Sequence, residues 1–216
     1  MMGEALPFYL GGRGGLAPLA FFPFCRPCFV PCFPSSFCAI LLISKMKTTN
    51  FGTRLLVKDA PGLITPLPGQ SYIKELIEAV HQAKFSIDVM QYQWNFYPGK
   101  STSLIQQLNR TLIDRVLNGL KVRVLLNKEG RGSHLMAINM RASKYLSDAG
   151  ASVKFGRSFP ITHAKLWLFD DDIVILGSHN LSNRSVTVNN EASVLIKSRP
   201  VLMEYRRYFS ILWNLL

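Results

Sequence analysis

Cysteine is absent from the last 178 residues of this 216-residue chain, because all four cysteines lie at or before Cys38. A disulfide framework for the main part of the chain is therefore excluded. Acidic residues are also scarce, since 13 Asp and Glu stand against 25 Lys and Arg, a formal net charge of +12. Charged residues make up only 18% of the chain and no short repeat is visible, which excludes coiled-coil, collagen-like and disordered classes.

Residues 1–45 have few charged residues and lack an uninterrupted apolar run long enough for a membrane-spanning helix. They contain half of the twelve prolines, and the prolines between 18 and 34 prevent a long helix because each removes an amide donor. The apolar run over 27–43 is broken by proline in its first half, whereas a spanning helix needs about 20 apolar residues. A membrane anchor there is an alternative, and a secretory signal lacks its basic region.

The four cysteines of this leader do not follow a familiar metal-binding pattern. Their C-x2-C-x3-C-x5-C spacing differs from that of two-knuckle zinc sites, so neither zinc nor a disulfide is favoured and their role stays open; they are Cys25, Cys28, Cys32 and Cys38. Met46 begins a segment of ordinary globular composition. We therefore expect a folded domain over 46–216, preceded by a leader over 1–45 that is an anchor, a disordered tail or a start-site artefact. A cytoplasmic location is expected, or a membrane-anchored one if the leader is translated and retained.

Apolar periodicity predicts alternating helices and strands after Gly69. Helical spacing predicts four helices. The first covers 70–83, and the second is capped by Ser101 or Ser103 and ends at Gly119. The third covers 133–148, and the last begins at Pro200. Strand patterns mark 85–92, 121–127, 151–155, 163–169, 173–176 and 191–197. The sequence therefore predicts the α/β class, a mixed β-sheet with helices on both faces.

The chemistry-bearing residues lie on two of these strands. His163 and Lys165 are two apart, so a strand would direct both side chains to one face, and Ser178 and Asn180 follow the next strand directly after Gly177. Such a set suits a phosphodiester. Lysine and asparagine can hold the non-bridging oxygens, and a neutral imidazole, abundant at pH 7 because the ordinary pKa of histidine is about 6.5, can attack phosphorus.

Neither cysteine nor a cluster of carboxylates joins this set, which argues against a metal centre, and no cofactor is expected. An imidazole without a partner could rotate, so an acceptor on its second nitrogen is needed. Glu191, one strand further on, is the candidate orienting carboxylate.

These residues resemble the HKD signature of the phospholipase D superfamily. The match runs over His163-x-Lys165-x4-Asp170-x6-Gly177-Ser178-x-Asn180, with an acidic residue, Glu191, eleven positions later. A short chain with one copy is similar to the small bacterial endonucleases of the superfamily and to its mitochondrial cardiolipin hydrolase and piRNA nuclease branch. The resemblance implies His163 as the nucleophile of a phosphohistidine intermediate, Lys165 and Asn180 as phosphate ligands, and Ser178 and Glu191 as their support. It implies structural roles for Asp170 and Gly177.

Covalent displacement also needs an acid for the leaving oxygen, which one copy of the motif does not supply. His81, His134 and His179 are not placed to serve by the sequence pattern. We therefore expect a homodimer in which two copies of His163 face each other, with His134 as the acid of a monomer as the alternative.

Basic residues concentrate between 121 and 157, and they predict a polyanionic partner. The candidate nucleic-acid contacts are Lys121, Arg123, Lys128 and Arg131. The favoured hypothesis is a metal-independent phosphodiesterase, an endonuclease acting on DNA or RNA. The alternatives are a phospholipase D-type hydrolase of phospholipid such as cardiolipin, held at a membrane through 27–43, and a non-catalytic nucleic-acid-binding module.

Overall fold

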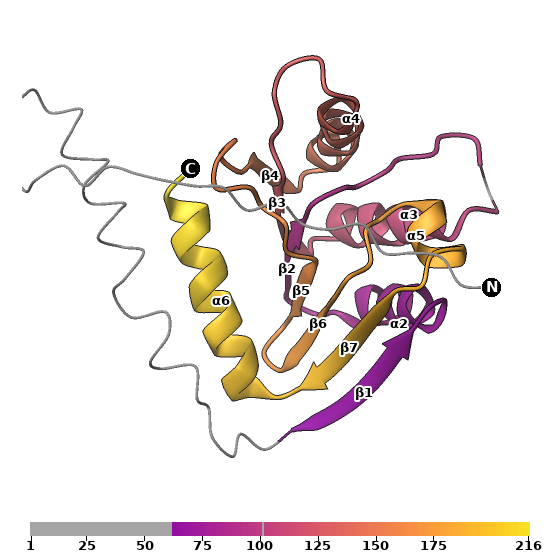
Figure 1. The fold of residues 1–216 in the computed structure, drawn as a ribbon. Helices are drawn as coiled ribbons and strands as arrows, with labels where there is room; N and C mark the ends of the chain where they lie inside the picture. The colour runs from indigo at the N-terminus through magenta and orange to yellow at the C-terminus, as the bar shows by residue number, and fades with distance from the viewer. Residues whose placement is uncertain (1–61, 101) are drawn as a thin grey trace, which may run out of the picture. The chain divides into compact units, whose positions relative to one another are not determined.

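The computed structural model describes residues 62–100 and 102–216 (Figure 1). The leader, its four cysteines and the domain boundary expected after residue 45 lie outside the described residues. The described strands are β1 (Leu63–Pro68), β2 (Ser86–Gln91), β3 (Lys121–Leu126), β4 (Ser152–Phe155), β5 (Leu166–Phe169), β6 (Ile173–Gly177) and β7 (Ala192–Lys197). The described helices are α2 (Ser71–Gln82), α3 (Leu104–Leu117), α4 (His134–Asp148), α5 (Asn183–Thr187) and α6 (Arg199–Asn214).

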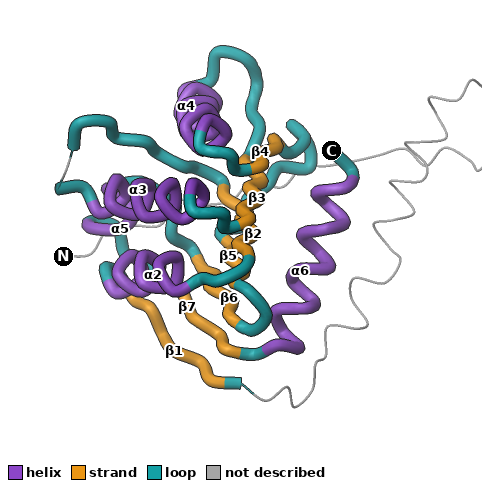
Figure 2. Tube along the Cα trace, turned by 180° about the vertical axis from the view of Figure 1, so that it is seen from behind, coloured by secondary structure: helices purple, strands orange, loops and turns teal. Residues whose placement is uncertain are grey.

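The strands form one mixed sheet in the order β1-β7-β6-β5-β2-β3-β4. β2, β3 and β4 pair in parallel, whereas β1, β7, β6, β5 and β2 pair with their neighbours antiparallel. Helices α2, α3, α4 and α5 lie on one side of the sheet and α6 lies on the other (Figure 2). Each side has its own hydrophobic core. The expected mixed α/β sheet with helices on both faces is confirmed.

The predicted helices begin and end where local chemistry stabilises their termini. Ser103 caps α3 by accepting from the backbone N–H of Gln106 at 3.3 Å, and Ser133 caps α4 by accepting from Met136 at 2.9 Å. Gly119 and Gly150 follow these two helices with φ of 93° and 105°, a left-handed conformation that favours glycine.

Two elements were not expected from the sequence. β1 contains Pro66 and Pro68, which weaken a strand pattern, but β1 is the edge of the sheet, where a missing amide donor is tolerated. The five-residue helix α5 is too short to show apolar periodicity, and Ser182 caps it by accepting from the N–H of Ser185 at 3.2 Å.

One predicted strand is shorter than expected. β5 begins at Leu166, so His163 and Lys165 precede the strand and do not lie on it as predicted. The ladders with β2 and β6 both end at Leu166, opposite Met90 and Leu176. The two residues lie instead in the extended segment that enters the strand.

The ends of several strands lie together on one side of the sheet. The carboxyl ends of β2, β3 and β6 lie there together with the start of the antiparallel strand β5. Carboxyl ends of strands are where open α/β sheets bind ligands. These strand ends carry the predicted catalytic residues, and we refer to them as the catalytic edge. We refer to the opposite ends of the strands, where β2 and β3 begin, as the far edge. Neither term means the outermost strand β1. Within 62–100 and 102–216, no helix is long and apolar enough to cross a membrane.

Candidate active site

His163 and Lys165 come together although neither lies on a strand. The Nζ atom of Lys165 is 3.3 Å from Nδ1 and 3.4 Å from Nε2 of the His163 ring, and it donates to the His163 carbonyl at 2.8 Å. His163 is exposed, whereas Lys165 is only 8% exposed. Burial lowers the pKa of Lys165, and the negative charge of Glu191 partly opposes this shift.

Tyr92, which the sequence did not single out, forms the wall behind this pair. Its ring centroid lies 4.7 Å from that of His163, and Lys165 Nζ is 5.2 Å from the same tyrosine ring. Burial and the neighbouring Glu129 raise the pKa of Tyr92, and its hydroxyl donates to the Glu129 carboxylate at 3.1 Å. Its position directly after the carboxyl end of β2 is the one signal that could have identified it.

Ser178 and Glu191 form a second pair at the catalytic edge. Ser178 Oγ donates to the Glu191 carboxylate at 2.5 Å and accepts from the backbone N–H of Ala192 at 3.1 Å. The carboxylate also accepts from Ser185 Oγ at 3.0 Å and from Asn189 Nδ2 at 3.1 Å. Burial raises the pKa of Glu191, but these hydrogen bonds outweigh it and the net shift is downward.

The partners of Glu191 differ from the one that the sequence suggested. No hydrogen bond joins its carboxylate to the His163 ring among the described residues, and its bonds go to Ser178, Ser185 and Asn189. An orienting role toward His163 therefore stays a prediction. The structure does give Glu191 an electrostatic connection to the site, because its charge acts on Lys165.

Asn180 follows Ser178 by two residues and extends the candidate site toward Ser185. Its backbone N–H donates to Ser185 Oγ at 2.9 Å, while its side-chain Oδ1 is buried without a hydrogen-bond partner among the described residues. The intervening His179 points into the core, stacked on Tyr72 at 4.2 Å. Its Nε2 donates to the Gly69 carbonyl at 3.1 Å, and burial lowers its pKa. A neutral, buried imidazole therefore anchors the segment that carries Ser178 and Asn180.

Gly177 and Asp170 shape the backbone around the site. A Cβ at Gly177 would lie 2.0 Å from Ser193 Oγ and 2.5 Å from the Ala192 carbonyl, so β6 can approach β7 this closely only without a side chain. Asp170 lies in the β5–β6 turn at the far edge with φ of 43°. Its carboxylate accepts from the backbone N–H groups of Lys84, Phe85 and Ser86 at 2.7 to 2.9 Å, which holds the start of β2.

The four basic candidates divide between the two edges. Lys128 and Arg131 are exposed on the loop between β3 and α4, next to Glu129 at the catalytic edge. Lys121 and Arg123 begin β3 at the far edge, away from His163, and their contact with nucleic acid stays a prediction. Residues of one strand that are six apart are separated by about 20 Å.

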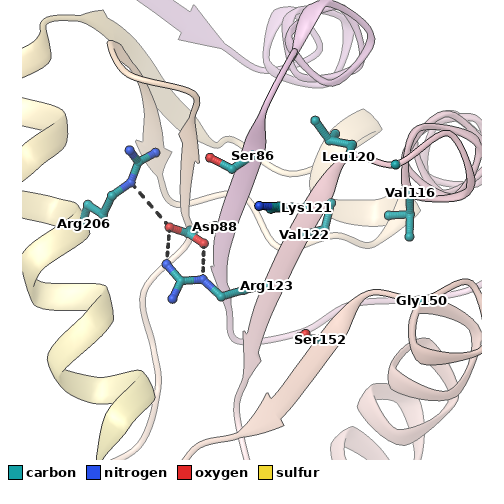
Figure 3. Close-up of a pocket in the computed structure, with 11 residues that line it drawn as sticks. Ser86, Asp88, Val116, Leu120, Lys121, Val122, Arg123, Gly150, Ser152 and Arg206 are labelled. Atoms are coloured by element: carbon teal, nitrogen blue, oxygen red, sulfur yellow. Dashed lines mark hydrogen bonds and ion pairs between the residues drawn. The ribbon is translucent and has the colours of Figure 1, made fainter.

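Arg123 has a structural partner at the far edge (Figure 3). Its Nε and Nη2 donate to the buried carboxylate of Asp88 at 2.7 and 2.8 Å, and Arg206 of α6 approaches the same carboxylate at 3.5 Å. The Asp88 hydrogen bonds raise the pKa of Arg123. The guanidinium also lies over the rings of Phe209 and Trp213 at 5.0 and 5.6 Å. Arg123 therefore ties the sheet to α6.

The described residues also bear on the metal question. Between 62 and 216, with residue 101 excepted, no group of three or more His, Cys, Asp or Glu side chains is arranged to hold a metal ion. The polar groups that the catalytic edge carries include an imidazole, an ammonium, a hydroxyl and an amide, those of His163, Lys165, Ser178 and Asn180. This combination can bind a phosphate group and attack it.

Comparison with known proteins identifies the type of domain that carries the site. A family model described as a cardiolipin synthase, PLD-like domain matches residues 76–213. The polyphosphate kinase of Vibrio vulnificus is 30% identical over 148 residues, 65% of this chain and 20% of that protein. The 5'-3' exonuclease PLD3 of Xenopus tropicalis is 28% identical over 171 residues, 74% of this chain and 33% of that protein. The chain thus spans about a fifth to a third of the length of these relatives.

The fold itself has a counterpart among solved structures. Nuc from Salmonella typhimurium, a phospholipase D family member, matches with a TM-score of 0.60 at 20% identity. The match covers 71% of this chain and 95% of that chain. It supports the same mixed sheet and helix arrangement.

Proposed function

The chain belongs to the phospholipase D superfamily, and from this membership we propose that it is a metal-independent phosphodiesterase, an endonuclease that cleaves DNA or RNA. One observation carries the proposal. The buried ammonium of Lys165 lies 3.3 Å from the exposed His163 ring, so a cation and a nucleophile can reach the same phosphate. The exonuclease PLD3 and the structure of Nuc support a phosphodiester substrate by relationship.

The proposed reaction has two steps, and side chains account for every proton transfer without a metal ion. The neutral His163 ring attacks phosphorus, a P–N bond forms, and the P–O ester bond to the leaving group breaks. Lys165 and Asn180 stabilise the charge on the non-bridging oxygens, as preorganised donors do in other transition states. A second imidazolium gives its proton to the leaving oxygen, and the resulting neutral imidazole then removes a proton from the water that hydrolyses the P–N bond.

The second imidazole is proposed to be His163 of a second copy of the chain, in a two-fold homodimer with a shared site. The exposure of His163 supports this arrangement, because its ring is accessible to another molecule. His134 is the alternative, since it lines the same pocket as Asn180. The two possibilities differ in whether a lone chain can be active.

Nucleic acid is the favoured substrate because of the charges at the catalytic edge. Lys128 and Arg131 are exposed there and are the proposed phosphate contacts. A phospholipid substrate is the second candidate, since Phe159 is 79% and Ile161 51% exposed just ahead of His163. Apolar side chains in this position could enter the surface of a bilayer.

The test is cleavage of single-stranded DNA, RNA and cardiolipin vesicles by the full chain in the presence of EDTA. We expect cleavage of nucleic acid, and we expect His163→Ala to abolish turnover while nucleic-acid binding persists. Turnover of cardiolipin without cleavage of nucleic acid would contradict the favoured substrate. Loss of activity in EDTA would contradict the metal-independent mechanism, and residual cleavage by His163→Ala would contradict the site.

A matched pair of variants tests which of the basic residues contact nucleic acid. Arg131→Gln should weaken nucleic-acid binding and reduce the slope of log K against log salt by about one, because one phosphate contact is lost. Arg123→Gln should leave the salt dependence unchanged and lower the free energy of unfolding, because the buried Asp88 loses its bidentate partner. The reverse result would identify Arg123, and not Arg131, as the phosphate contact.

A further inference from the structure

A recess adjoins the candidate active site and shares Asn180 with it. Its volume is ≈ 390 Å³, within the range of small-molecule sites, and its polar lining includes Gln93, Asn95 and Asn189. Leu135 and Ile138 of α4 add apolar surface. The lining thus combines amides, which can pair with a planar polar edge, with aliphatic groups, which can cover a planar face.

Two chain segments hold the recess in a fixed shape. The backbone N–H of Leu181 donates to the Gln93 carbonyl at 3.0 Å, and the N–H of Asn95 donates to the Leu181 carbonyl at 2.8 Å. These bonds place the segment after β2 beside the segment that carries Asn180. Trp94, between the two amide residues, is fully buried and its Nε1 donates to Asn109 at 2.8 Å. The amides are therefore mounted on a rigid base.

The amides of the recess retain unused hydrogen-bonding capacity. Gln93 Nε2 donates to Asn95 Oδ1 at 2.8 Å, and the other polar side-chain atoms of these two residues make no hydrogen bond with the described part of the chain. Asn180 Oδ1 is buried and also has no partner there. A buried polar atom without a partner is unfavourable, so a ligand that supplies donors and acceptors would be stabilised.

Arg184 adds a cation to the lining of the recess. It is exposed, and its guanidinium forms no hydrogen bond or ion pair with any other described residue. A guanidinium in this position can pair with a phosphate or stack on a planar ring. The recess therefore presents amides, an aliphatic surface and a free cation within reach of the phosphate-binding Asn180.

We propose that this recess binds one nucleobase of the substrate, next to the phosphodiester that is cleaved, with Arg184 on the neighbouring phosphate. The proposal rests on the proposed nuclease function and names the part of the substrate that its site recognises. An acyl chain would leave the amides unpaired, whereas the edge of a base carries both donors and acceptors. A base can enter only when it is unstacked and unpaired, so the substrate is single-stranded.

The experiment uses the full chain and single-stranded oligonucleotides that carry one abasic residue at a defined position. Cleavage is measured separately at every phosphodiester bond. We expect the bond whose flanking base is missing to be cut about tenfold more slowly, about 1.4 kcal/mol, because the contacts of that base with the recess are lost. Bonds several nucleotides away should be cut at the ordinary rate. Duplex DNA of the same sequence should be a poorer substrate than the single strand.

Two variants test whether the recess causes this discrimination. Asn95→Ala should cut the intact and abasic oligonucleotides at similar rates, and Arg184→Gln should weaken binding of both. Arg110→Gln is the control, because it removes the same charge from an exposed position on α3 that does not line the recess. If the unmodified chain cuts every bond of the abasic oligonucleotide at the same rate, this proposal is overturned while the nuclease function stays intact. This measurement needs no variant, so it decides the matter even if Asn95→Ala does not fold. Hydrolysis of cardiolipin vesicles with no cleavage of any oligonucleotide would overturn both proposals.

Discussion

Replacing Lys165 by methionine should lower activity and leave the fold as stable as before or more stable. Methionine matches the length of the lysine stem but carries no charge. The Lys165 ammonium is proposed to stabilise the non-bridging oxygens in the transition state. Removal of one such donor lowers kcat by about 10²–10³, which corresponds to about 2.7–4 kcal/mol.

The effect on stability follows from the burial of the side chain. Only 8% of Lys165 is exposed, and burial lowers its pKa below the ordinary value of 10.5, which means that the fold disfavours the charged form. Methionine removes this penalty and also the hydrogen bond from Nζ to the His163 carbonyl. Because the exposed His163 segment lets water replace that bond, we expect the free energy of unfolding at pH 7 to rise by up to about 1 kcal/mol.

The sign of the pH dependence gives an independent check. A lysine whose pKa is lowered by folding binds fewer protons in the folded than in the unfolded chain, between the lowered value and 10.5. The stability contribution of Lys165 therefore rises with pH through that window. The advantage of Lys165→Met measured at pH 7 should shrink as the pH approaches 10.5.

The assay combines steady-state cleavage of a labelled oligonucleotide with urea unfolding at pH 7 and pH 10. Lys74→Met is the control, because Lys74 is an exposed lysine on α2. It should change neither activity nor stability by more than about 0.5 kcal/mol. The reasoning is refuted if Lys165→Met keeps ordinary kcat, or if it unfolds more readily than the unmodified chain by 1 kcal/mol or more.

Three further predictions concern the surroundings of the site. Glu191→Gln should move the alkaline limb of the pH–activity profile to lower pH, because the charge of Glu191 raises the pKa of Lys165; an unchanged limb would contradict the connection. Gly177→Ala should lower the free energy of unfolding by about 1–3 kcal/mol in urea titration, since its Cβ would lie 2.0 Å from Ser193 Oγ; a stability equal to the unmodified chain would show that β7 yields easily. His134→Ala should retain most of the activity, because the acid is proposed to come from a second copy of the chain, and the active species should sediment as a dimer. Loss of activity in this variant, together with a monomeric active species of the unmodified chain, would favour His134 as the acid.

Much of this fold was predictable because the signals are local. Apolar periodicity placed α2, α3 and α4, and serine caps and glycine stops fixed the ends of α3 and α4 to within a residue or two. The HKD spacing singled out residues of the catalytic edge, among them His163 and Lys165, whose side chains lie 3.3 Å apart. β1 and α5 escaped prediction, since an edge strand tolerates proline and one helical turn has no period.

The charged residues show where local reasoning ends. Arg123 and Arg131 are eight positions apart and look alike in sequence, but one forms an ion pair with the buried Asp88 and the other is exposed beside the site. Strand β3 separates them, and its length carries one to the far edge and the other to the catalytic edge. Whether a basic residue is structural or free to bind depends on which carboxylate the fold brings to it.

By itself, the sequence determined the family, most of the secondary structure and the set of reactive groups, because these depend largely on neighbours a few positions apart. Only the tertiary structure decided the environment of each group: a buried Lys165 against an exposed His163, a Glu191 held by Ser178, Ser185 and Asn189, and an amide-lined recess beside Asn180. Burial and electrostatic interaction depend on distances in space between segments remote along the chain, and no sequence spacing encodes those distances.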